Sequence, residues 1–123
     1  KKKAFARWDP QVLRDYVTHG LYDEDDRRVL AFDRAVESDI YNTMPHHLGS
    51  LLRKHPLRCP AAFIGGRASV EMKQVGMALT QQLTHGRITM LDGTHLFPME
   101  KPLVTAAAIE ASLLNLATVA GQG

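Results

Sequence analysis

The apolar positions in the second half of the chain predict two buried strands joined by a helix. Residues 61–64 and 87–91 are each an apolar run of strand length, followed by a glycine-containing turn. Between them, apolar residues recur at the helical spacing, at Val70, Val75, Leu79 and Leu83. We expect Gly86 to end this helix. A strand, a helix and a strand in this order predict a βαβ unit with parallel strands and a right-handed crossover.

The apolar segment from Leu103 to Ala117 predicts a long final helix. Pro102 suits its first position, because an amide hydrogen there would have no helical partner. One apolar stripe is expected to pack on the sheet and consists of Ala106, Ile109, Leu113 and Leu116. We expect no stretch to approach the ~20 apolar residues of a membrane helix, and therefore no membrane partner.

The first half of the chain predicts three further helices. The first has Asp9 as its N-cap residue and ends at Gly20, the second starts after Asp33, and the third ends near His55. The charged segment 22–28 between the first two helices is expected to be a loop whose carboxylates face water.

His95 lies in the loop between the second strand and the final helix. That loop follows the carboxyl end of a strand, which is where ligands bind in open α/β sheets. An ordinary imidazole has a pKa of about 6.5, so it exchanges protons readily near neutral pH. His95 is therefore a candidate general base, although an isolated loop histidine is more often structural.

Two motifs in this region resemble the α/β-hydrolase family. The run D-G-T-H-L-F-P-M-E-K-P at residues 92–102 is similar to the family's histidine loop, in which G-x-H follows the last strand and an acidic-basic-proline run starts a helix. The run C-P-A-A-F-I-G-G at residues 59–66 is similar to the preceding strand, and residues 8–41 are similar to a helical cap. The resemblance covers nearly the whole chain, most specifically residues 57–102, and implies that His95 is the general base of a triad.

The resemblance implies an α/β fold class, namely the C-terminal portion of an α/β-hydrolase fold. Residues 1–56 would form a helical cap or lid, and residues 57–123 a β-α-β-α unit of the core with parallel strands. A complete hydrolase of this family needs roughly twice the length of this chain, so an N-terminal half is expected to be missing. Caps of this family shape substrate access, and the residues that would line a pocket, none of which we assign, are Trp8, Tyr41, Met44 and His46 or His47.

The nucleophile that the resemblance implies is not in this chain. Neither the elbow G-x-S-x-G nor an HGGG-like oxyanion segment occurs in the 123 residues. In the family both precede the cap, so we expect an upstream segment to supply them and the chain alone to be inactive. Ser69 follows a strand and precedes a helix, but it lacks the next glycine of an elbow and comes after the cap.

The triad acid remains open at the level of sequence. Many family members carry an aspartate in the loop after the first core strand, and residues 66–71 contain none. We favour an acid from the upstream half. Glu71 is the candidate within this chain, although the helix dipole also explains a first-turn glutamate, and a degenerate triad is the third possibility. Asp92 and Glu100 do not have the spacing of a triad acid.

The composition of the chain limits the classes of binding partner that we expect. The chain is 45% hydrophobic and 23% charged with a net charge of +2, which favours neither nucleic acid nor an anionic membrane. The single cysteine, Cys59, excludes an internal disulfide and fits a reducing, cytoplasmic location. The acidic run 23–26 and the pair His46-His47 lack metal-ligand spacing, so we expect no metal and no cofactor.

Three functions of different classes follow. The chain is part of an esterase-like hydrolase that acts on a small-molecule substrate, or a binding relative without a working triad. In the third interpretation it is an inactive fragment that pairs with its missing half or with itself through an exposed sheet edge. The substrate is not identified, because family members act on esters, lactones, epoxides and haloalkanes, some with an aspartate nucleophile.

Overall fold

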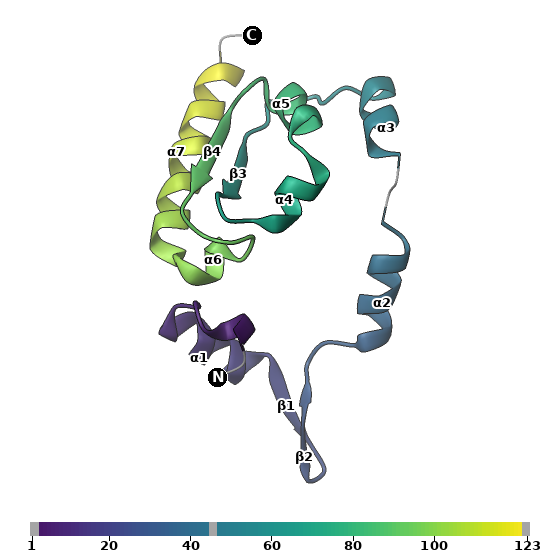
Figure 1. Cartoon of the computed structure of the whole chain (residues 1–123), viewed down its shortest axis with the longest axis vertical. Helices are drawn as coiled ribbons and strands as arrows, with labels where there is room; N and C mark the ends of the chain where they lie inside the picture. Colours follow the sequence, from purple (N-terminus) through teal and green to yellow (C-terminus); the bar gives the residue numbers. More distant parts are fainter. Residues whose placement is uncertain (1–2, 45–46, 122–123) are drawn as a thin grey trace.

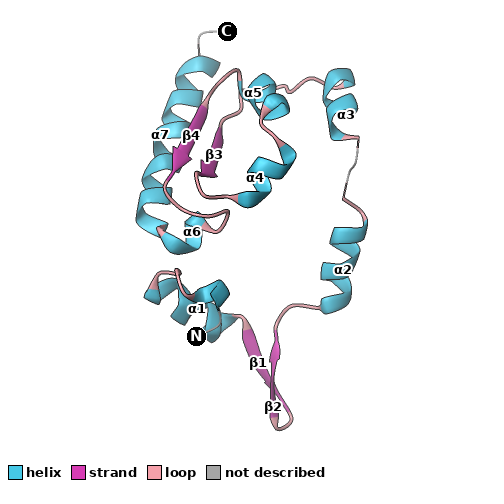
Figure 2. Ribbon diagram, in the orientation of Figure 1, coloured by secondary structure: helices cyan, strands magenta, loops and turns pink. Residues whose placement is uncertain are grey.

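The structure is a computed structural model that describes residues 3–44 and 47–121. The chain consists of helices and short strands (Figures 1 and 2). In chain order the elements are η1 (Lys3–Phe5), α1 (Pro10–His19), β1 (Leu21–Glu24), β2 (Arg27–Leu30), α2 (Arg34–Asn42), α3 (Leu48–Lys54), β3 (Phe63–Gly66), α4 (Val70–Val75), α5 (Ala78–Thr84), β4 (Ile88–Leu91), α6 (Phe97–Glu100) and α7 (Pro102–Ala120). The predicted α/β class is thus present at a coarse level, as a small parallel sheet with helices around it.

The parallel sheet consists of β3 and β4. Phe63 lies opposite Ile88 and Gly66 opposite Leu91, which confirms the predicted strand–helix–strand unit, although β3 begins two residues later than predicted. In Figure 1 this sheet lies between α7 and the pair α4 and α5. The prediction of one continuous crossover helix is wrong, because the chain breaks at Gly76, whose φ of 79° is left-handed and readily adopted by glycine.

The final helix packs through a different stripe from the predicted one. Leu113 is 60% exposed and Ile109 is 47% exposed. Ala106 is exposed as well, so three of the four predicted positions face outward. The more protected positions recur at helical spacing and are Thr105, Ala108, Ser112, Leu116 and Val119. Because α7 is apolar on nearly every side, its periodicity does not single out one face.

The expectation that no segment reaches membrane length is also wrong. Helix α7 has 19 residues and a mean hydropathy of 1.6, so by length and composition it is able to cross a membrane, and 6% of it is buried. Core helices of water-soluble proteins meet the same criteria. The helix alone therefore does not assign the chain to a membrane.

The predicted helices of the first half are present. The side chain of Asp9 accepts hydrogen bonds from the amides of Gln11 and Val12, and that of Asp33 accepts one from Ala35, which confirms both as N-cap residues. Figure 1 shows that the hairpin of β1 and β2 points away from the parallel sheet, whereas α3 lies beside α5.

The charged segment 22–28 is a hairpin and not the predicted loop. Strands β1 and β2 pair antiparallel across a turn in which Asp25 has a φ of 52°. The pairing places Asp23 opposite Arg28, whose Nε lies 3.1 Å from the Asp23 Oδ1. Arginines of β2 thus face acidic residues of β1, and this cross-strand pairing favours a hairpin over a loop.

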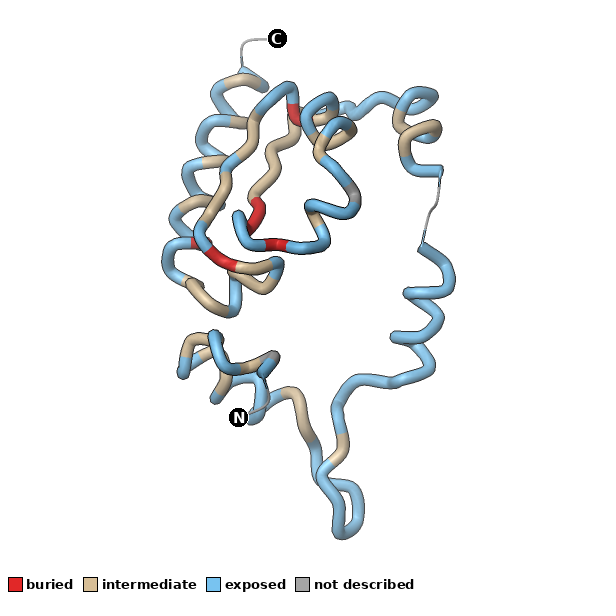
Figure 3. Tube along the Cα trace, viewed as in Figure 1, coloured by how far each residue is buried: buried red, intermediate tan, exposed pale blue. Residues whose placement is uncertain are grey.

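Few positions in this chain are buried (Figure 3). Among the residues whose burial is described, the buried ones carry no large apolar side chain and are Gly65, Gly66, Ser69, Thr84, Gly93 and Thr105. Three of them, Gly66, Ser69 and Gly93, lie at the carboxyl ends of β3 and β4. The closest packing in the described chain is therefore found where the loops after the two parallel strands meet.

Replacing Gly66 by alanine is expected to destabilise this meeting point. A Cβ at residue 66 would lie 2.0 Å from the Thr94 carbonyl oxygen and 2.5 Å from that of Gly93, and backbone atoms cannot move aside as a flexible side chain does. We expect Gly66→Ala to lower the free energy of unfolding by about 3 kcal/mol, measured by urea unfolding followed by circular dichroism.

Gly49→Ala is the matched control for Gly66→Ala. A Cβ at residue 49 lies on helix α3 and would meet its nearest side-chain atom at 3.7 Å, an ordinary contact. It should stabilise the chain by up to about 1 kcal/mol through helix propensity. Equal stability of the Gly66→Ala variant and the wild-type chain would contradict the close approach of the two loops.

Candidate functional site

His95 lies in the loop between β4 and α6, beside the loop that follows β3. The Arg67 amide donates a hydrogen bond to the Leu91 carbonyl at 2.8 Å, and the Ala68 amide donates one to the Gly93 carbonyl at 2.9 Å. These bonds hold the two loops together at the carboxyl edge of the sheet, where a ligand site is expected in an α/β fold.

Glu71 is the carboxylate that the structure brings to His95. Its Oε1 lies 3.0 Å from Nδ1 of the imidazole, and the two side chains are 55% and 52% exposed. Glu71 reaches this position because the chain turns after β3 and starts α4 at Val70. Glu71, the one candidate acid that the sequence offers within this chain, is thus in contact with the candidate base His95.

The pKa of Glu71 is lowered below its ordinary value of 4.5. The first cause is the hydrogen bond from its own backbone amide, the second is the Ser69 hydroxyl, and the charge of His95 acts in the same direction. The carboxylate therefore stays ionised from neutral pH to below pH 4.5. An ionised carboxylate beside Nδ1 favours a proton on that nitrogen and leaves Nε2 as the proton acceptor.

Ser69 does not have the environment of a nucleophile. The residue is 2% exposed, and its Oγ donates a hydrogen bond to Glu71 Oε2 at 2.9 Å while it accepts one from the Met72 amide at 3.2 Å. A nucleophilic hydroxyl needs a base within reach and access to substrate. Here the hydroxyl is occupied by Glu71 and by the first turn of α4.

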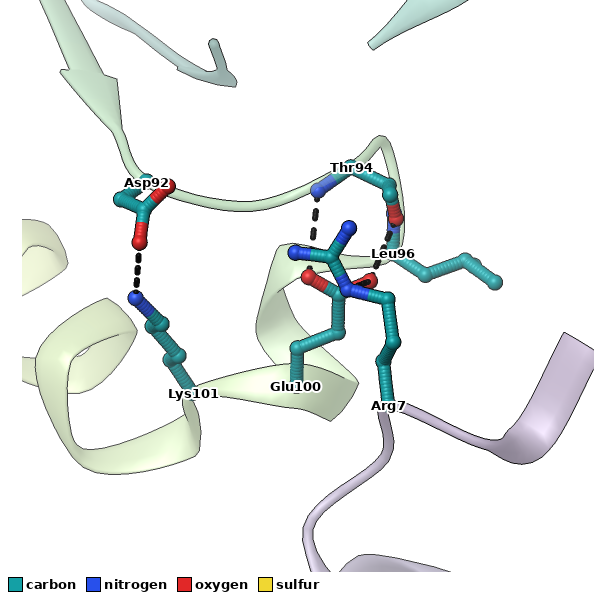
Figure 4. Close-up of polar contacts among 6 residues, drawn as sticks. All are labelled: Arg7, Asp92, Thr94, Leu96, Glu100 and Lys101. Atoms are coloured by element: carbon teal, nitrogen blue, oxygen red, sulfur yellow. Dashed lines mark hydrogen bonds and ion pairs between the residues drawn. The ribbon is translucent and has the colours of Figure 1, made fainter. Parts of the chain in front are cut away.

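A second glutamate, Glu100, holds the backbone of the histidine loop (Figure 4). Its side chain is 5% exposed, its Oε2 accepts a hydrogen bond from the Thr94 amide at 3.1 Å, and its Oε1 accepts one from the Thr94 hydroxyl at 2.7 Å. The Thr94 hydroxyl in turn accepts a hydrogen bond from the Leu96 amide at 3.1 Å. Both neighbours of His95 in the sequence are therefore tied to this network.

Two basic residues complete the surroundings of the loop. Arg7 Nε lies 3.4 Å from Glu100 Oε1, and Lys101 Nζ lies 2.5 Å from Asp92 Oδ2 (Figure 4). The hydrogen bond from Lys101 is the main reason that the pKa of Asp92 lies below its ordinary range. Asp92 and Glu100 thus have partners other than His95, in agreement with their exclusion as the triad acid on spacing.

Removal of the Glu100 carboxylate is expected to loosen the histidine loop. Glu100→Ala leaves the amide and the hydroxyl of Thr94 without their acceptor, and unpaired half-buried donors cost about 1–3 kcal/mol. We expect a loss of about 2 kcal/mol in the free energy of unfolding, with faster hydrogen exchange at the Thr94 amide. Glu110→Ala, on the exposed side of α7, is the control and should stay within about 0.5 kcal/mol of wild type. Unchanged exchange at Thr94 in the Glu100→Ala variant would rule out this bracing.

The residues considered for a pocket in the cap do not converge on His95. Trp8 packs edge-on against Phe5 and Tyr16, with ring centroids 5.0 and 5.3 Å apart, which is a packing role. Tyr41 is exposed in the last turn of α2, and Met44 is exposed after that helix ends. His47 is exposed before α3, and His46 lies outside the described residues.

Beside the contact between Glu71 and His95 there is a shallow apolar cavity of about 230 Å³. It is lined by Phe63, Glu71, Met72, Gly76, Met77 and Thr80. Glu71 is the one residue shared by this cavity and the contact with His95, so the hollow opens next to the candidate site.

Sequence reasoning missed Arg7 and Thr94. Arg7 is far from the histidine loop in sequence, and its pairing follows from a bond between the Asp9 amide and the Met99 carbonyl at 2.8 Å. No local pattern reveals such a contact. Thr94 lies six residues before Glu100, and their contact depends on how the loop between them folds, so it has no local pattern either.

The part of the chain that the structure describes contains no cluster of metal-ligating side chains. Within residues 3–44 and 47–121, no three histidine, cysteine, aspartate or glutamate side chains come together as metal ligands would.

In comparisons with known proteins, no family model, no curated protein and no solved structure matches this chain.

Proposed function

We propose that this chain is the C-terminal portion of an α/β-hydrolase and supplies His95 as the general base for hydrolysis of an ester-like substrate. The observation that carries the proposal is the distance of 3.0 Å between Glu71 Oε1 and His95 Nδ1, in loops at the carboxyl ends of two parallel strands. The similarity of residues 92–102 to the family's histidine loop supports the same assignment.

In this proposal the imidazole of His95 first accepts a proton and then donates it. With a serine nucleophile, Nε2 takes the hydroxyl proton as the oxygen attacks the carbonyl carbon and gives it to the departing alcohol oxygen. In the second step Nε2 takes a proton from the water that cleaves the acyl intermediate and returns it to the serine. Glu71 remains ionised, keeps the other ring proton on Nδ1 and stabilises the imidazolium that forms in each step. An upstream segment supplies the oxyanion donors and the nucleophile, which is a serine or an aspartate. An aspartate nucleophile is already ionised, so in that case Nε2 takes its proton from the water that hydrolyses the covalent intermediate.

The exposed apolar surface supports a missing partner segment. Large apolar side chains lie open on α7, including Leu103 at 85%, Leu113 at 60% and Leu114 at 66% exposure. Burial of such side chains against a further layer stabilises a fold by roughly 1.5–3 kcal/mol each. In the proposed assembly the upstream half of the same fold provides this layer and the next strand of the sheet.

The same exposed surface favours a second candidate function. A chain with these open side chains also suits an interaction protein, or an inactive fragment that self-associates, with His95 and Glu71 as an ordinary surface ion pair. Sedimentation of the 123-residue chain separates the two candidates in part, because a monomer of 13.7 kDa at micromolar concentration contradicts self-association.

The direct test of the hydrolase proposal is ester hydrolysis by the product of the complete reading frame that contains these residues. p-Nitrophenyl acetate and butyrate are suitable probes because their alcohol leaves readily and is coloured. Hydrolysis that depends on His95 supports the proposal. A complete reading frame without an upstream nucleophile, or hydrolysis that does not depend on His95, overturns it.

A further inference from the structure

The hydroxyl of Ser69 is placed between the backbone of α4 and the carboxylate of Glu71. Ser69 is 2% exposed, its amide donates a hydrogen bond to the Gly66 carbonyl at 3.0 Å, and its Oγ accepts one from the Met72 amide. The residue is therefore fixed by the turn before it and by the helix after it. Its hydroxyl proton points to Glu71 Oε2, at an Oγ–Oε2 distance of 2.9 Å.

Both oxygens of the Glu71 carboxylate are engaged. Oε2 accepts the hydrogen bond from Ser69, and Oε1 lies 3.0 Å from His95 Nδ1. Glu71 is itself 55% exposed, and an exposed glutamate side chain ordinarily samples many rotamers. Anchoring one oxygen on a buried, fixed hydroxyl restricts where the other oxygen lies. The hydroxyl thus has the geometry needed to aim Glu71 at the imidazole.

Helix capping does not account for this arrangement by itself. A cap needs an oxygen that accepts from an amide of the first turn, which Ser69 provides to Met72, and Asp9 and Asp33 perform the same task at α1 and α2. An aspartate in place of Ser69 would cap equally well. The proton that Ser69 donates to Glu71 is a separate property, because the aspartate side chain has no proton to donate at neutral pH.

We propose that Ser69 is a positioning residue, whose hydroxyl holds the Glu71 carboxylate on Nδ1 of His95. The inference rests on the proposed function, in which the proton on Nδ1 leaves Nε2 free to act as base. Ser69 touches neither the imidazole nor a substrate in this scheme and acts through Glu71 alone. The lowered pKa of Glu71, to which the Ser69 hydroxyl contributes, agrees with a hydrogen bond to the ionised form.

The test measures the tautomer of His95 directly in the 123-residue chain. Multiple-bond ¹H–¹⁵N spectra, recorded at about pH 9 where an ordinary imidazole is neutral, give the share of molecules with the proton on Nδ1. In the Ser69→Ala variant we expect this share to fall toward the value found for Glu71→Gln. Ser69→Thr, which keeps a hydroxyl, should restore most of it. In the Glu71→Gln background, Ser69→Ala should cause no further change.

Other results of the tautomer measurement would overturn either this inference or the proposed function. An unchanged tautomer in a folded Ser69→Ala chain, or an effect of Ser69→Ala that persists in the Glu71→Gln background, overturns the inference and leaves the proposed function intact. If Ser69→Ala fails to fold, Ser69→Asp keeps the cap and removes the donor, and retention of the Nδ1 proton in that variant is equally contradictory. Absence of the Nδ1 proton in the wild-type chain would instead count against the proposed function.

Discussion

Replacing His95 by alanine in the complete protein should lower kcat for p-nitrophenyl butyrate by at least about 10³-fold. The proposed mechanism routes the proton of the nucleophile and that of the leaving group through one imidazole nitrogen, so both chemical steps lose their base and acid. KM should change little, since the imidazole contributes to proton transfer and not to ground-state binding of the ester.

His55→Ala is the matched control for His95→Ala. His55 is an exposed histidine that follows α3 and shares no contact with the His95 loop among the interactions described above. Its replacement should leave kcat within about twofold of wild type. A His95→Ala enzyme with wild-type turnover would show that another group supplies the base, and the assignment of residues 92–102 as a histidine loop would be wrong.

Replacing Glu71 by glutamine should lower kcat by roughly 10²-fold or more. Glutamine has nearly the same shape as glutamate, but it carries no charge to stabilise the imidazolium. Its amide nitrogen also donates a hydrogen bond and therefore favours the tautomer with the proton on Nε2. The shape of the loop is preserved, so the loss would come from electrostatics and tautomer. Glu110→Gln is the control, because Glu110 is an exposed glutamate on α7.

The pH dependence of stability gives an independent measurement on Glu71. Its pKa in the folded chain lies below 4.5, so its contribution to stability is fully present above pH 4.5 and is lost as the pH falls through the folded value. The free energy of unfolding should therefore fall less steeply below pH 4.5 in Glu71→Gln than in wild type. Equal slopes would show that the carboxylate makes no specific contact.

Much of the local structure could be predicted because its signals are local. Asp9 and Asp33 cap helices by bonding amides two or three residues away. The apolar run 87–91 predicts a strand that the structure has at Ile88–Leu91, although the predicted burial is wrong, because its residues are half-buried or exposed. The parallel pairing of β3 and β4 follows from their spacing around a crossover helix.

The errors have separate physical causes, and the apolar pattern alone reveals none of them. Segment 22–28 forms a hairpin because Arg28 faces Asp23 across the pair, and a charged composition by itself does not reveal that pairing. Helix α7 is apolar on nearly all sides, so its packed stripe depends on how it meets the sheet. The helix breaks at Gly76 because this residue adopts a positive φ. The apolar positions continue at helical spacing on both sides of it, so the sequence pattern does not show the break.

The candidate site could be predicted in part. His95 stood out because a histidine after a strand has a chemical use, and Glu71 was one of three possibilities for its partner. The sequence could not select Glu71, because the contact depends on the angle at which α4 leaves the sheet. Glu100 holds the histidine loop through Thr94, and Arg7 pairs with Glu100. Both contacts depend on how the loop and the N-terminal segment fold, which no sequence pattern shows.

The most direct test of the account is the tautomer of neutral His95 in the wild-type chain, read from a multiple-bond ¹H–¹⁵N spectrum at about pH 9. We expect the proton on Nδ1, the nitrogen 3.0 Å from Glu71, and none on Nε2. A spectrum with the proton mainly on Nε2 would show that Glu71 does not hold the imidazole, and His95 would then be an ordinary surface histidine.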